Sequence, residues 1–127
     1  MPRYDPALEP DPGQWLALPE QTRIDLAAQY HRAARIQLPN VAAHATFHAI
    51  VENQIALGLP PVVRAMARLR ADGLSRHDAI HAVCTVLAEH FFELMQSPDG
   101  TLAADSQARY DAAVERLDAA DWQRRYG

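Results

Sequence analysis

The chain has 127 residues, of which 49% are hydrophobic, so its composition fits one folded domain and argues against global disorder. Its formal charge of −4 argues against general nucleic-acid binding. The single cysteine, Cys84, excludes a disulfide within the chain. No stretch near the N-terminus resembles a signal peptide, and no apolar run approaches the roughly 20 residues of a membrane span. We therefore expect a cytoplasmic protein with no membrane partner.

Residues 1–18 are predicted to form an irregular N-terminal arm. Four prolines are spread through this segment, at Pro2, Pro6, Pro10 and Pro12. Proline lacks a backbone donor and restricts the residue before it, so a regular helix is not expected here. Trp15 and Leu16 are the apolar residues that we expect to dock the arm onto the rest of the protein.

Five helices are predicted in residues 19–127, each bounded by start or stop signals. The expected ranges are about 20–38, 41–57, 60–73, 76–96 and 103–122, with caps at Asn40, Gly58, Gly73 and Ser75 and a turn at 97–100. No segment alternates polar and apolar residues with a period of two, so no sheet is expected. The predicted fold is therefore all-α, a compact bundle of about five helices in a single domain.

Two of the predicted helices carry histidines at a spacing that suits metal binding. His44, His48 and Glu52 follow one another at intervals of four, and so do His77 and His81. Residues four apart lie on one face of a helix. Facing helices often build metal sites in this way. The sequence therefore predicts a divalent metal site formed by His48, Glu52, His77 and His81 between two antiparallel helices.

Other residues are secondary candidates for the same site. His44 and His31 flank apolar positions and can point inward, and Cys84 follows His81 by three residues, where a thiolate would favour zinc. Each also has an ordinary interpretation, as a hydrogen-bonded histidine or a core cysteine. His90 falls on the opposite side of its helix and is expected to be exposed.

Two stretches of the chain resemble an uncharacterised bacterial family, a domain of unknown function. They are His48-Ala-Ile-Val-Glu-Asn-Gln-Ile-Ala56 and Gly73-Leu-Ser-Arg-His-Asp-Ala-Ile-His-Ala82. The likeness covers roughly residues 15–95, including the stretches 30–32 and 38–40. The chain departs from the family pattern after His81, where Val83 and Cys84 replace an expected Ile-Gly, so a family-wide role for Cys84 is in doubt.

The resemblance implies that His48, Glu52, His77 and His81 form the polar centre of the family, but it implies no reaction. It also implies supporting roles for three neighbours of that centre. Asn53 and Gln54 would hydrogen-bond behind the ligands or between helices, and Arg76 would pair with a carboxylate such as Glu52 or Asp78.

Three functions remain open from the sequence. The first is a site for zinc, iron, manganese or nickel, with or without catalytic activity on an unknown substrate. The second is an adaptor or structural module with a hydrogen-bonded His/Glu core. The third is a helix-turn-helix DNA-binding protein, suggested by the proportions of the third and fourth predicted helices and the turn at 73–75 between them, and by the locally basic residues Arg64, Arg68, Arg70 and Arg76. The last predicted helix could also form the interface of a homo-oligomer.

Overall fold

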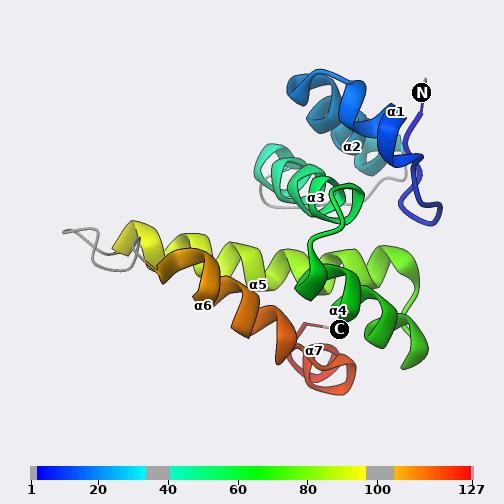
Figure 1. Ribbon diagram of the computed structural model, residues 1–127. Coiled ribbons are helices and arrows are strands. Elements are labelled where there is room, and N and C mark those ends of the chain that lie inside the picture. Colours follow the sequence, from blue (N-terminus) through cyan, green and yellow to red (C-terminus); the bar gives the residue numbers. More distant parts are fainter. Residues whose placement is uncertain (1–2, 34–40, 97–104, 127) are drawn as a thin grey trace. The chain divides into compact units, whose positions relative to one another are not determined.

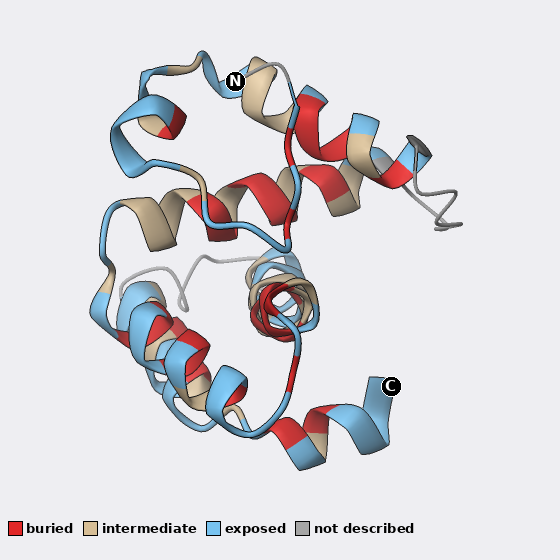
Figure 2. Cartoon of the chain, turned by 90° about the vertical axis from the view of Figure 1, so that its right-hand side faces the viewer, coloured by how far each residue is buried: buried red, intermediate tan, exposed pale blue. Residues whose placement is uncertain are grey.

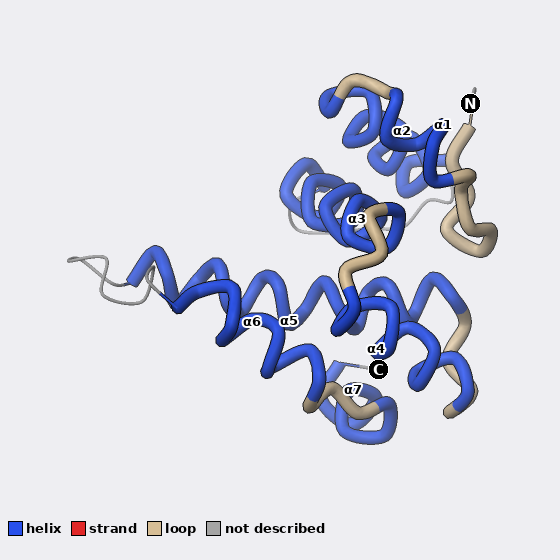
Figure 3. Tube along the Cα trace, in the orientation of Figure 1, coloured by secondary structure: helices blue, strands red, loops and turns tan. Residues whose placement is uncertain are grey.

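The computed structural model describes residues 3–33, 41–96 and 105–126. Within these ranges the chain forms seven helices and no strand (Figure 1, Figure 3), which confirms the all-α prediction. The helices are α1 Pro12–Ala17, α2 Glu20–Ala33, α3 Val41–Ala56, α4 Pro60–Ala71, α5 Arg76–Gln96, α6 Ser106–Glu115 and α7 Ala119–Tyr126. In the described part of the chain, no helix is both long enough and apolar enough to span a bilayer.

The contacts divide the chain into two units, residues 1–59 and residues 60–127. The first unit contains α1 to α3, and its core consists of Tyr4, Trp15, Leu26, Ala27, Ala28, Ala45 and Ala49. The second unit contains α4 to α7, with buried apolar residues that include Val62, Leu69, Ile80, Val83 and Val114. Figure 2 shows buried positions recurring along the helices, as burial of one stripe of each helix requires.

The prediction that residues 1–18 are irregular was wrong for α1. Asp11 Oδ1 accepts the backbone N–H of Gln14 at 2.9 Å, and Pro12 occupies the start of the helix. Proline is well tolerated there, because the first N–H groups of a helix have no partner within it and the fixed φ of proline suits the helix. Pro12, which in the sequence argues against a regular helix, is therefore the first residue of α1.

The ends of α3 and α4 and the start of α5 lie where the sequence predicted them. Gly58 and Gly73 have φ values of +72° and +101° and end α3 and α4 in the left-handed region. Ser75 Oγ accepts the N–H of Asp78 at 3.1 Å and caps α5, as predicted. The predicted cap at Asn40 and the turn at 97–100 lie outside the described residues.

The single helix predicted for residues 103–122 is two helices, α6 and α7. Asp118 interrupts it, because its carboxylate accepts the N–H of Asp121 at 2.9 Å and caps α7. Arg68 stabilises the break from α4, where Nη2 donates to the carbonyl oxygens of Val114 and Leu117 at 3.1 and 2.9 Å. These carbonyls lie in the last turn of α6 and just beyond it, where helix carbonyls lack some of their usual intrahelical donors, so the arginine adds donors there.

An exposed contact joins α7 to α5. The Tyr126 hydroxyl donates a hydrogen bond to Glu89, and Arg125 lies 3.5 Å from the same carboxylate. The hydrogen bond to Glu89, followed by desolvation, raises the pKa of Tyr126 above its ordinary value. All three side chains are about half exposed, so this contact adds little to stability.

The arginines behind the DNA-binding interpretation are largely used within the second unit. Arg64 forms an ion pair with Glu115 at 3.0 Å, Arg68 holds the end of α6, and Arg76 is buried at the start of α5. Arg70 is exposed. Three of the four arginines therefore have partners or positions within the second unit, and the helix-turn-helix interpretation stays a prediction.

Replacing Gly73 with alanine is expected to destabilise the protein by about 1–2 kcal/mol, because an L side chain at φ +101° is strained although no atom lies within 4 Å of the new Cβ. Gly13→Ala is the matched control. Gly13 lies inside α1, and its Cβ would meet Asp11 Oδ1 at an ordinary 3.4 Å, so this change should be neutral or slightly stabilising. Urea unfolding of both variants measures the difference, and equal effects would contradict the assignment of strain to Gly73.

Candidate metal centre

Three histidines of the first unit meet where α2 contacts α3. His31 lies in the last turn of α2, and His44 and His48 lie one turn apart on α3. The ring centroids are 4.6 Å apart for His31 and His44, 5.1 Å for His31 and His48, and 5.9 Å for His44 and His48. One ring nitrogen of each lies within 4.8 Å of those of the other two. This histidine cluster (His31, His44 and His48) could hold a metal ion.

The backbone sets the tautomer of His31. Its Nδ1 lies 2.7 Å from the carbonyl oxygen of Ala27, one turn earlier on α2. A carbonyl oxygen only accepts, so Nδ1 carries the proton and donates. In the neutral ring the lone pair is then on Nε2. Metal-binding histidines usually have their second nitrogen fixed in this way.

Tyr4 sets the tautomer of His48. The Tyr4 hydroxyl donates to Glu52 Oε2 and also lies 2.7 Å from His48 Nε2. The hydroxyl has one proton, and Glu52 accepts it, so His48 Nε2 donates to the tyrosine oxygen. The lone pair of a neutral His48 is therefore on Nδ1. His31 and His48 each have one nitrogen held as a donor and the other left as a base.

Most of the centre is shielded from solvent. His31 and His48 are fully buried and Glu52 is 1% exposed, whereas His44 is half-buried. Aromatic rings pack around the imidazoles edge to face, with Tyr4 at 5.3 Å from His48 and Tyr30 at 5.4 Å from His31.

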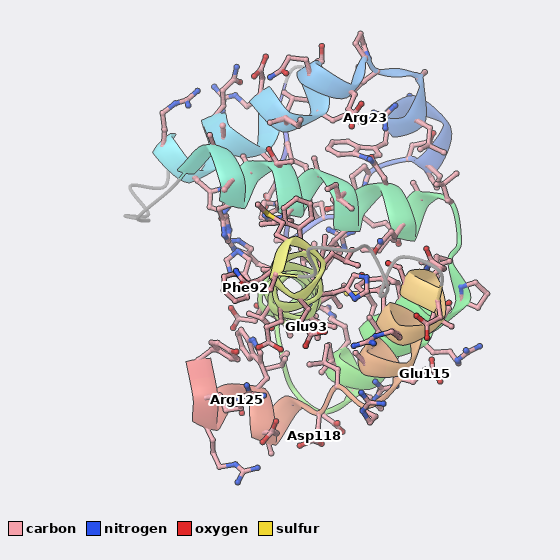
Figure 4. All side chains as sticks on the ribbon, turned by 90° about the vertical axis from the view of Figure 1, so that its left-hand side faces the viewer. Arg23, Phe92, Glu93, Glu115, Asp118 and Arg125 are labelled. Atoms are coloured by element: carbon pink, nitrogen blue, oxygen red, sulfur yellow. The ribbon has the colours of Figure 1, made fainter. Side chains whose placement is uncertain are left out.

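A hydrogen-bonded network built on Asn53 holds α1 against α3. Asn53 Oδ1 accepts from Trp15 Nε1 and from Arg23 Nη1, both at 2.9 Å. Arg23 (labelled in Figure 4) also donates to the carbonyl oxygens of Leu16 and Leu18 at 3.0 Å. Asn53 thus hydrogen-bonds between helices, one of the two roles that the sequence suggested for it. The half-buried Gln54 lies beside it on α3, and its role stays a prediction.

The structure changes the ranking of the candidate ligands within the first unit. His31 and His44 were secondary candidates, yet both lie with His48 in the cluster. Glu52 shares the Tyr4 hydroxyl with His48 as a contact. Sequence reasoning missed Tyr4 and Arg23. Tyr4 belongs to no helix, so no periodicity could indicate that its side chain faces the core.

The remaining predicted ligands, His77 and His81, lie on α5 in the second unit. Their ring centroids are 4.1 Å apart, which confirms that they share one face of the helix. Arg76 and Cys84 are buried on the same helix. The prediction that His77 and His81 ligate together with His48 and Glu52 joins residues of two units and stays a prediction, as do the roles of Arg76 and Cys84.

The prediction that His90 is exposed was wrong. Its side chain is half-buried, its Nε2 lies 2.8 Å from Ser106 Oγ, and its ring lies 5.6 Å from that of Tyr110. The helix α6 covers this side of α5, and helical periodicity within α5 alone could not show that. His90 is therefore a hydrogen-bonded structural histidine of the second unit.

Comparisons with models of protein families, with curated proteins and with solved structures find no match for this chain. The resemblance to a bacterial family of unknown function stays a prediction. The properties of the centre are consequently argued from its own residues.

Proposed function

We propose that this protein binds one divalent transition-metal ion through His31, His44 and His48. The observation that carries the proposal is the convergence of three imidazoles from two helices, with ring nitrogens within 4.8 Å of one another. Ligand bonds of about 2.0–2.1 Å bring such nitrogens around a single ion after small side-chain adjustments.

The fixed tautomers support the proposal independently of the distances. Ala27 holds the proton of His31 on Nδ1, and Tyr4 with Glu52 holds that of His48 on Nε2. Each ring therefore has a lone pair at a defined nitrogen. A histidine whose second ring nitrogen donates to a backbone carbonyl or to another polar group is in the usual state of a metal ligand.

The donor set narrows the choice of metal. Imidazole nitrogens suit zinc, iron and nickel, while manganese prefers carboxylate oxygens. Three histidines are also the ligand set of some catalytic zinc sites, in which water or substrate takes the fourth position. An ion bound there would supply Lewis acidity and lower the pKa of a coordinated water. The Tyr4 hydroxyl and the Glu52 carboxylate are the neighbouring groups that would accept or return a proton.

Elemental analysis of untagged protein purified without chelator tests the proposal. We expect about one equivalent of zinc, iron or nickel per chain, retained at neutral pH. Lowering the pH below about 6 should release it, because imidazole must be neutral to ligate. Protein that contains no metal and takes none up on titration would contradict the proposal and leave the adaptor interpretation, with a hydrogen-bonded core, in its place.

A further inference from the structure

A pocket of about 400 Å³ opens in the first unit beside the histidine cluster. It is lined by Arg3, Tyr4, Asp5, Leu26, Gln29 and Tyr30. Its volume falls within the range of about 300–1,000 Å³ that is usual for small-molecule sites. All the lining residues come from the N-terminal segment and from α2, so the pocket belongs to one unit.

Two tyrosines form the wall that the pocket shares with the histidine cluster. Tyr4 lines the pocket, and its hydroxyl contacts His48 and Glu52. Tyr30 also lines the pocket, and its ring lies 5.4 Å from that of His31. A molecule in the pocket would therefore lie one side chain away from the candidate metal centre.

The lining defines the chemistry of a ligand. Tyr4 and Tyr30 meet edge to face at 6.4 Å and, with the buried Leu26, provide an apolar, aromatic surface. Arg3 is exposed and has no ion-pair partner among the described residues. Its planar guanidinium matches a carboxylate in geometry and charge.

Asp5 limits the charge that the pocket accepts. Its Oδ1 accepts the N–H of Ala7 at 2.9 Å, which fixes the carboxylate near the pocket. A second negative charge on a ligand would be repelled there, so a monoanion fits better than a phosphate dianion or a dicarboxylate.

We propose that this pocket binds a small aromatic monocarboxylate, with the carboxylate at Arg3 and the ring against Tyr4 and Tyr30. That this ligand is the substrate of the neighbouring centre rests on the proposed metal site. Binding itself does not, because no residue of the histidine cluster lines the pocket.

Titration of benzoate into chelator-treated protein, followed by NMR, tests the proposal without the metal. We expect saturable shifts at Leu26 and Tyr30, and at least about tenfold weaker binding of the neutral isostere benzamide. Arg3→Gln should weaken benzoate binding by a similar factor. Arg32→Gln, at an exposed arginine of the same unit that does not line the pocket, should leave it unchanged.

Three results would overturn the proposal: no benzoate binding at millimolar concentration, equal binding of benzoate and benzamide, or unchanged binding by the Arg3→Gln protein. Metal content is measured separately on the same preparations before chelation. A protein that binds metal but not benzoate refutes the pocket alone, and one that binds benzoate but not metal refutes the proposed function alone.

Discussion

Replacing His44 with alanine is expected to leave the protein folded and to remove its bound metal. His44 is the half-buried member of the histidine cluster, whereas His31 and His48 are fully buried. Truncating His44 therefore disturbs packing least and still removes one of three ligands. The measurements are metal content per chain and thermal unfolding with and without added metal.

The size of the effect follows from linkage. An ion that binds only the folded protein stabilises it by about 2.7 kcal/mol when free metal is roughly 100 times the dissociation constant. Wild-type protein should show a gain of that order on metal addition, and the His44→Ala protein should show almost none. The difference should vanish in excess chelator.

His90→Ala is the matched control. His90 is also half-buried and hydrogen-bonded, but it lies in the second unit beside Ser106. It should retain full metal content and the full metal-dependent gain in stability. Equal metal in the His44→Ala and wild-type proteins would refute the ligand assignment.

The same assay tests the ligands that the sequence predicted on α5. Loss of metal in a His81→Ala protein would bear out that prediction, and full retention would contradict it. The proposal of a site formed by His31, His44 and His48 requires that the His44→Ala protein lose its metal, whether or not the His81→Ala protein does.

The helices could be predicted where a local signal decides their ends. The glycines at 58 and 73 and the cap at Ser75 behave as their sequence context indicates, because φ > 0 and side-chain capping are local requirements. The helix starts at Asp11 and Asp118 were missed, because they depend on more than a local signal. Asp11 and Asp118 each cap a helix, but an aspartate caps a helix only where the chain before it leaves the helical path. At Asp118 that path depends on a tertiary contact, the hydrogen bond from Arg68 to the carbonyl oxygen of Leu117.

The candidate site could be predicted only in part, because spacing reports on one helix at a time. The interval of four correctly places His44 with His48 and His77 with His81. It cannot show that His31 on α2 meets the first pair, since that contact depends on how two helices cross. The contribution of Tyr4 was beyond periodicity altogether, as it comes from a non-helical segment.

The N-terminal arm is therefore part of the candidate centre as well as of the core. Tyr4 contacts His48 and Glu52 through its hydroxyl, packs on Trp15 with ring centroids 5.4 Å apart, and lines the pocket. Because Tyr4 contacts His48 Nε2, the contacts that hold the arm in place also determine which nitrogen of His48 carries the proton. Trp15 anchors the arm, because its side chain is fully buried and its Nε1–H donates to Asn53.

Replacing Trp15 with alanine is expected to destabilise the first unit by about 3–5 kcal/mol, the usual cost of truncating a buried tryptophan. The side chain is fully buried, and its Nε1–H donates to Asn53. The loss is comparable with the whole stability of a small unit, so much of the first unit should unfold. Circular dichroism during urea unfolding measures it, and Trp122 fluorescence reports on the second unit.

Two further variants separate the contributions of Trp15. Trp15→Phe keeps most of the buried volume but not the donor, so it should cost clearly less than Trp15→Ala. Leu57→Ala, at a side chain that is 71% exposed, should change stability by no more than about 0.5 kcal/mol. If Trp15→Ala were as mild as Leu57→Ala, the arm would not be anchored by its indole, and the tautomer of His48 would no longer follow from a docked Tyr4.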